Sequence, residues 1–271
     1  MSKERIASTF DLVASTFDRV GPRFFAHSGR RLVELAQIPS GAEVLDVATG
    51  RGAVLFPAAE WAGWRGRVIG VDMSVGMVRG VAADVRRMGL RQVEICQMDA
   101  ERLGFADGSF GFVLCGHSIF YFPQALREFH RVLKPGGRVG MTIVAQGCWD
   151  WILEVLDRYL PEGGSGEEDE GEEAEGVAIN TAGGLEEILS RAGFEGIRVV
   201  EEAMDLVYGD EEEWWSALRT LGVRGAIEEL EAGAVERLKA EMFGRLQAFK
   251  RSDGIHVLYR VLYALGRKAG Q

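Results

Sequence analysis

The stretch "EVLDVATGRGAV", residues 43 to 54, joins a short apolar run to a glycine loop. The run is typical of a buried β-strand, and Gly50 and Gly52 follow it within a few residues. Glycine lacks the Cβ atom that would keep a ligand away from the backbone, so this spacing indicates a ligand-binding loop. By itself the loop fits a dinucleotide, a phosphate group or a molecule without phosphate.

The chain after this loop alternates between apolar runs and helical patterns. Further strands are expected at residues 67–72, 92–99, 110–116 and 138–144, and helices at 53–63, 74–89 and 123–133. Ser74 and Gly89 have the residue types that begin and end a helix. Strands that alternate with helices predict an α/β fold, in which a doubly wound parallel sheet is covered on both faces.

The two ends of the chain add further elements. Residues 1–40 are expected to form an N-terminal helical lid broken at Gly21 and Pro22, and residues 41–271 a single ligand-binding domain. Insertions are expected in that domain at 145–180 and 210–250. The first contains the acidic run 161–176, which has too little apolar surface to fold and is predicted to be a disordered loop.

The net charge of −10 comes mostly from this acidic run, which holds eight acidic residues and no basic one. The rest of the chain is close to neutral and lacks the basic excess of nucleic-acid-binding proteins, so a nucleic-acid partner is not expected. The N-terminus lacks the pattern of a signal peptide, and no apolar run is long enough to span a membrane, so a cytoplasmic location is expected. The three cysteines do not have the spacing of a zinc site, and no metal is expected.

Acidic residues gather where the predicted parallel strands end. Ligands of open α/β sheets bind beyond the carboxyl ends of the strands, where Asp46, Asp72, Asp99 and His117 are all expected. A nicotinamide dinucleotide is one candidate, because Asp72 is 22 residues after Gly50 and suits a ribose.

Two features oppose a phosphate-bearing ligand. The third glycine of the dinucleotide pattern is replaced by Leu55, and the carboxylate of Asp46 precedes a loop that would receive phosphate charges. S-adenosylmethionine instead offers an ammonium group, a sulfonium cation, a ribose diol and an adenine amine, and carboxylates suit each of these. The acid pattern therefore favours S-adenosylmethionine.

Four segments in order resemble the motifs of class I S-adenosylmethionine-dependent methyltransferases, near the ubiquinone and menaquinone biosynthesis branch. They are "EVLDVATGRG", "VIGVDMS", "MDAERLGFADGSFGFVLCGHSIFYF" and "ALREFHRVLKPGGRV", within about residues 40–145. The resemblance implies a Rossmann-like seven-stranded sheet, mostly parallel with an antiparallel last strand. It also implies an enzyme that transfers a methyl group to a small, partly hydrophobic molecule at oxygen, nitrogen or carbon.

The resemblance further implies roles for single residues. Those assigned to the cofactor are Asp46, Ala48, Gly50 and Gly52 for the methionine part, Asp72 for the ribose, Met73, Asp99 and Ala100 for adenine, and Cys115 around the methyl group. Independently of the resemblance, the apolar and aromatic residues of the N-terminal lid place Phe17 near the cofactor. Ala48 stands where the family often has glycine. His117 is the candidate catalytic base, and His27, Tyr121 and Trp149 are candidate acceptor residues beneath the lid.

Other interpretations stay open at this point. Asp72 can be a helix cap, Asp99 a turn residue, and His117 a polar pocket residue or a structural histidine. The alternative functions are a non-catalytic S-adenosylmethionine-binding protein and an NAD-dependent oxidoreductase. The expected state is a monomer or a homodimer.

Overall fold

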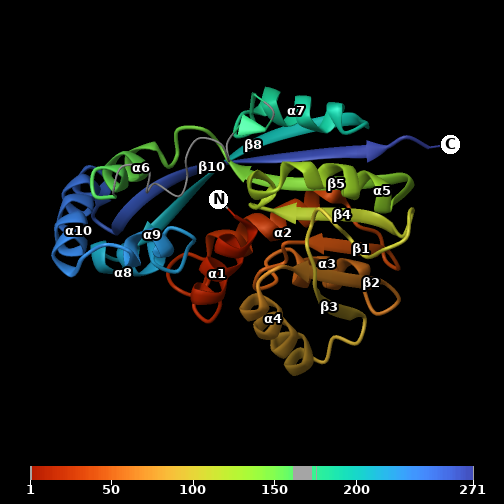
Figure 1. The fold of residues 1–271 in the computed structure, drawn as a ribbon, viewed down its shortest axis with the longest axis horizontal. Helices are drawn as coiled ribbons and strands as arrows, with labels where there is room; N and C mark the ends of the chain where they lie inside the picture. Colours follow the sequence, from red (N-terminus) through yellow and green to blue (C-terminus); the bar gives the residue numbers. More distant parts are fainter. Residues whose placement is uncertain (1, 161–172, 175, 271) are drawn as a thin grey trace.

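The structure is a computed structural model that describes residues 2–160, 173–174 and 176–270. Its main sheet has the strand order β3-β2-β1-β4-β5-β10-β8 (Figure 1). The strands are β1 (Glu43–Val47), β2 (Arg67–Asp72), β3 (Val93–Gln97), β4 (Phe110–Gly116), β5 (Leu133–Val144), β8 (Phe194–Tyr208) and β10 (Gly254–Lys268). The two-residue strand β9 (Lys250–Arg251) pairs with β10.

The strands from β3 to β5 pair in parallel, whereas β10 runs antiparallel to both β5 and β8. The sequence prediction of a mostly parallel sheet with an antiparallel last strand is therefore confirmed. Strand β5 begins at Leu133, before the expected start at residue 138, and its pairing with β4 shifts register between Phe110 and Phe112. Residues 134–137 therefore interrupt the ladder without ending the strand.

Helices cover both faces of the sheet and bury two apolar layers. The helices of the sheet are α3 (Leu55–Ala62), α4 (Val75–Met88), α5 (Leu126–Val132) and α7 (Ala182–Arg191), with short 3₁₀ turns η1 (Ile119–Tyr121) and η2 (Pro123–Ala125). The Ser74 hydroxyl accepts a hydrogen bond from the Met77 amide, and Gly89 ends α4 with a φ of 67°. Both capping predictions are confirmed.

A second group of helices lies beside the far ends of β8 and β10 (Figure 1). It comprises α6 (Asp150–Asp157), α8 (Glu211–Leu218), α9 (Arg224–Glu228), α10 (Ala232–Leu246) and the turn η4 (Gln247–Phe249). Its core is apolar and includes the buried side chains of Trp214 and Trp215. None of the helices in the described part of the chain is both long and apolar enough to cross a membrane.

The N-terminal segment forms α1 (Lys3–Val13) and α2 (Phe24–Ala36). Helix α1 lies between α4 and the helix group, in contact with α4 and α9 (Figure 1). Because α1 ends at Val13, Phe10 lies on this helix and Phe17 follows it. Their rings nevertheless lie 6.1 Å apart, because the chain folds back after α1.

The acidic run largely lies outside the described residues. Near its end, strand β6 (Glu173–Ala174) pairs antiparallel with β7 (Val177–Ala178). Glu173 and Ala174 therefore form a short strand within the run that was expected to be disordered.

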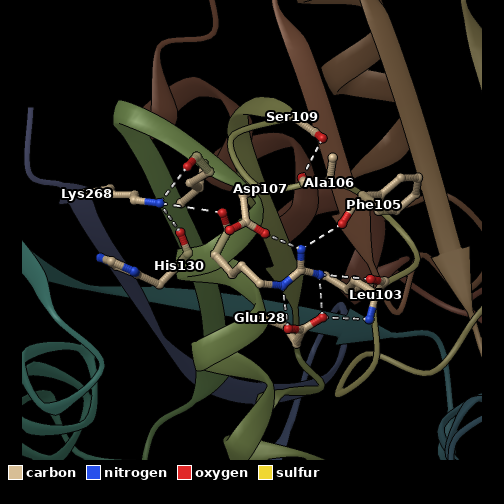
Figure 2. Close-up of polar contacts among 10 residues, drawn as sticks. Leu103, Phe105, Ala106, Asp107, Ser109, Glu128, His130 and Lys268 are labelled. Carbon is tan, nitrogen blue, oxygen red and sulfur yellow. Dashed lines mark hydrogen bonds and ion pairs between the residues drawn. The ribbon is translucent and has the colours of Figure 1, made fainter.

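A polar network holds the segment that follows β3 (Figure 2). The guanidinium of Arg131 donates to the carbonyl oxygens of Leu103 and Phe105, at 2.9 and 2.7 Å, and to the carboxylates of Asp107 and Glu128. Glu128 in turn accepts from the Leu103 amide at 2.8 Å. The network fixes the connection between β3 and β4, which begins close to Asp99.

Candidate functional site

A cavity of about 1310 Å³ lies beyond the carboxyl ends of β1, β2 and β4, beneath α1 and α2. Its volume exceeds the usual range of small-molecule pockets, so it has room for two molecules side by side. Four non-glycine residues that line it have positive φ angles between 52° and 56°: Asp18, Arg23, Ala48 and His117. Such strained conformations gather at functional sites.

The glycine loop after β1 forms one wall. Gly50 has a φ of 51°, and a Cβ atom built there would meet no atom within 4 Å. Gly52 has a φ of 85°, and a Cβ atom there would lie 2.4 Å from the Phe56 ring. Gly50 therefore leaves room for a ligand, whereas Gly52 is required by packing. Ala48 takes the same left-handed conformation, with a φ of 54°. Its Cβ atom makes this conformation sterically unfavourable, whereas a glycine would adopt it without that free-energy cost.

Asp46 lies at the floor of this loop with only 1% of its surface exposed. One carboxylate oxygen accepts from the Thr49 hydroxyl at 2.6 Å, and the other, Oδ1, is buried with no hydrogen-bond partner among the described residues. Burial, helped by the charge of Asp72, raises the pKa of Asp46 to about 7. A cationic ligand would supply the missing partner and favour the ionised carboxylate.

Asp72 ends β2 and holds the loop in place. Its two oxygens accept from the amides of Gly50 and Ser74, at 2.8 and 2.9 Å. Burial raises its pKa, although these backbone hydrogen bonds oppose the shift. A carboxylate accepts about four hydrogen bonds, so Asp72 can still accept from a ligand diol.

Asp99 lies just after β3 and is bound to helix α1. Its oxygens accept from the Lys3 ammonium and from the Glu101 amide, at 2.8 and 2.9 Å. Burial would raise the pKa of Asp99, but these hydrogen bonds outweigh it and the pKa is lowered. The neighbouring Ala100 and also Met73 line the cavity.

His117 stands at the end of β4, where its amide donates to the Thr142 carbonyl oxygen at 2.9 Å. Its Nε2 lies 2.8 Å from the Ser28 hydroxyl oxygen, and Nδ1 is buried with no hydrogen-bond partner among the described residues. Burial lowers the pKa of His117 to about 3, so the imidazole is neutral at pH 7. The rings of Phe24 and Phe25 lie 4.8 and 5.3 Å from it.

Comparisons with known proteins agree with this geometry. A family described as "Methyltransferase domain" matches residues 44–137. The chain is 32% identical over 270 residues to nocamycin O-methyltransferase of Saccharothrix syringae, covering 95% of this chain and 96% of that protein. The chain belongs to the class I S-adenosylmethionine-dependent methyltransferase family. This membership favours a methyl donor over a nicotinamide dinucleotide.

Two further similarities accompany that assignment. The methyltransferase is 40% identical over 165 residues to aklanonic acid methyltransferase of a Streptomyces strain, covering 59% of this chain and 75% of that protein. Its fold resembles the YcgJ protein of Bacillus subtilis, with a TM-score of 0.61 and 18% identity over 90% of this chain and 99% of that one.

Most of the predicted site residues come together in the methyltransferase. Those that line the cavity are Phe17, Asp46, Ala48, Gly50, Gly52, Asp72, Met73, Asp99, Ala100, His117, Tyr121 and Trp149. Two of the predicted residues do not line the cavity. Cys115 is fully buried in the core beside Val47 of β1, and burial raises the pKa of its thiol to about 12. His27 is exposed on α2 beside Glu202, whose pKa is lowered chiefly by Arg31.

Sequence reasoning missed three residues that hold the site together. Ser28 contacts His117, Lys3 contacts Asp99, and Asp11 accepts from the Ser74 hydroxyl and the Gly76 amide at 2.5 and 2.7 Å. Each contact joins the N-terminal segment to a residue more than sixty positions away. No local pattern in the sequence signals such a contact.

Proposed function

We propose that this methyltransferase transfers a methyl group to an oxygen of a small, partly hydrophobic molecule held beneath α1 and α2. The observation that carries the proposal is the shared cavity, which extends from the glycine loop to His117 and the aromatic side chains of the lid. The choice of oxygen is supported by the relative named an O-methyltransferase, which aligns over nearly the whole chain.

The residues present fit S-adenosylmethionine. The open space at Gly50 and the unpartnered Oδ1 of buried Asp46 suit the methionine part and its ammonium group. We assign Asp72 to the ribose diol, and Met73, Asp99 and Ala100 to the adenine. When bound, the cofactor supplies an activated methyl group, whose carbon–sulfur bond breaks with the electron pair left on sulfur as the new bond to oxygen forms.

The protein has three tasks in such a reaction. The glycine loop after β1 and the buried carboxylates orient the methyl donor, and α1 and α2 exclude water. The apolar wall of the cavity holds the acceptor oxygen in line with the bond that breaks. His117 is assigned as the base that takes the acceptor proton. The low pKa of His117 suits a proton transfer that occurs late, after the bond to the methyl group has begun to form, because the acceptor hydroxyl becomes strongly acidic as its oxygen gains the methyl group.

The test is turnover on a panel of phenols, alcohols, carboxylic acids and amines, measured as release of S-adenosylhomocysteine. We expect activity on oxygen acceptors, and a loss of about 100-fold or more in kcat for His117→Ala, with unchanged affinity for S-adenosylhomocysteine. His27→Ala is the matched control, because His27 is exposed away from the cavity. Turnover on amines alone would overturn the assignment to oxygen, and binding of S-adenosylhomocysteine without any turnover would favour a non-catalytic binding protein.

A further inference from the structure

Aromatic side chains form an unbroken series of ring contacts around the cavity. Neighbouring ring centroids lie between 4.2 and 6.1 Å apart. In order, this aromatic belt is Phe120, Tyr121, Phe10, Phe17, Phe25, Phe24, Tyr259 and Trp149. All of its members except Tyr259 line the cavity.

The belt is assembled from distant parts of the chain. Its rings come from α1, the turn after it, α2, η1, β10 and the residue before α6. They meet mostly edge to face or tilted, as at Phe10 and Tyr121, whose planes cross at 82°. Such pairs prefer offset and edge contacts, so a flat aromatic guest can add further contacts of the same kind.

His117 is attached to this belt through Phe24 and Phe25, and Ser28 orients its ring. The Ser28 oxygen also lies 3.1 Å from the Phe24 carbonyl oxygen and 3.3 Å from that of Phe25. A carbonyl oxygen only accepts, so each of these contacts is a hydrogen bond only when Ser28 donates its single hydroxyl hydrogen there. With that hydrogen donated to a carbonyl oxygen, the Ser28 oxygen accepts from Nε2–H of His117, and Nδ1 keeps a lone pair.

We propose that the acceptor is a flat aromatic molecule that presents a hydroxyl group to Nδ1 of His117, with Ser28 as the positioning residue that fixes this tautomer. The inference rests on the proposed methyl transfer and adds the class of acceptor. As the oxygen is methylated its O–H bond breaks, and the proton passes to the lone pair of Nδ1. A carboxylate fits less well, because it has no proton to donate and its charge would face that lone pair.

The first experiment uses three matched probes: 2-naphthol, its saturated analogue decahydro-2-naphthol, and 2-naphthoic acid. Calorimetry with S-adenosylhomocysteine comes first, because failure to bind it would overturn the proposed function itself. With that ligand bound, we expect 2-naphthol to bind about 3- to 10-fold more tightly than decahydro-2-naphthol. We also expect 2-naphthol to bind more tightly than 2-naphthoate. Equal affinity for the two alcohols, tighter binding of the acid, or no binding of any probe would overturn the inference.

Two variants test whether the aromatic belt causes the preference for 2-naphthol over decahydro-2-naphthol. Phe25→Leu should reduce the preference for the aromatic alcohol to within about 2-fold. Phe249→Leu is the matched control, because Phe249 packs on Trp151 outside the cavity. If Phe25→Leu keeps the full preference, the belt does not select the acceptor.

The role of Ser28 is read from the ¹⁵N signals of the His117 imidazole, which do not depend on turnover. We expect the Nε2–H tautomer in the native protein, a mixture of tautomers in Ser28→Ala, and recovery in Ser28→Thr, which keeps the hydroxyl. Addition of 2-naphthol should shift the Nδ1 signal. A native protein with Nδ1–H, or a Ser28→Ala variant with an unchanged tautomer, would overturn this part of the inference.

Discussion

Asp11 attaches the first helix to the beginning of α4, and Asp11→Ala should loosen that helix. One oxygen of Asp11 accepts from the Ser74 hydroxyl at 2.5 Å and from the Gly76 amide at 2.7 Å, at the beginning of α4. Hydrogen bonds to charged groups contribute about 1.5–3 kcal/mol when buried, and less here because Asp11 is exposed. We expect a loss of about 1–3 kcal/mol in the docking of α1.

That loss corresponds to an opening of α1 that is roughly 5- to 150-fold more frequent. The assay is amide hydrogen exchange, in which residues 6–13 of α1 should lose protection by this factor while the amides of β1 keep theirs. Glu4→Ala is the control, because Glu4 is also exposed on α1 but contacts neither Ser74 nor Gly76. Unchanged protection of α1 in a folded Asp11→Ala protein would refute the reasoning.

Gly76→Ala tests the same contact from the other side. A Cβ atom at Gly76 would lie 2.9 Å from the Ala14 Cβ and 3.2 Å from the Asp11 Cα, so it should push α1 away. Alanine has a higher helix propensity than glycine, so α4 itself should become more stable. Faster exchange in α1 together with slower exchange in α4 would separate loss of docking from general destabilisation.

Three further predictions concern the core of the site and the fold. Asp72→Ala should weaken the binding of S-adenosylhomocysteine by about 1.5–3 kcal/mol, as measured by calorimetry, and an unchanged Kd would contradict the assignment of Asp72 to the ribose. The pKa of Asp46 is raised to about 7, so between about pH 4 and pH 7 the folded protein holds a proton that the unfolded chain has lost, and the free energy of unfolding should fall as the pH rises. Below pH 7 the carboxyl is protonated, so the affinity for the cationic cofactor should fall. Asp46→Asn should flatten both pH profiles. Arg131→Ala should lower the free energy of unfolding by about 1–3 kcal/mol in urea denaturation, because it leaves the carbonyl oxygens of Leu103 and Phe105 without this donor.

The sequence predicted the sheet and the residues that gather at the carboxyl ends of its strands, because both are encoded in short segments. The strand, the glycine loop and Asp72 lie within a few residues of one another or at a fixed end of a strand. Parallel strands bring their carboxyl ends to one edge, so position along the chain was enough to gather Asp46, Asp72, Asp99 and His117.

The acceptor side depends on tertiary contacts and was predicted less well. His27 and Ser28 are neighbours on α2, and the sequence does not say which of them contacts His117, because α2 begins only at Phe24 after an irregular turn. Cys115 was misplaced because the sequence does not show where along β4 the buried strand ends and the cavity lining begins, which is at Gly116. An error of one residue there exchanges a residue of the cavity lining for a fully buried one.

The two N-terminal helices are held to the protein to different degrees. Helix α2 buries Leu32, Val33 and Ala36 in the core, and Gly29 lies so close to the loop before α3 that a Cβ atom would be 2.4 Å from the Ala53 carbonyl oxygen. Helix α1 buries only Val13. Elements with few buried apolar contacts open most readily.

Opening of the cavity is therefore expected at α1, through the polar contacts of Lys3 and Asp11, while α2 stays in place. Ser28 lies on α2, so the orientation of His117 does not depend on whether the cavity is open. Phe10, by contrast, leaves the aromatic belt whenever α1 opens, and Phe17 follows directly after that helix. We therefore expect a ligand to enter past α1 to His117, whose ring Ser28 already contacts, and we expect the closing of α1 to complete the aromatic wall and exclude water.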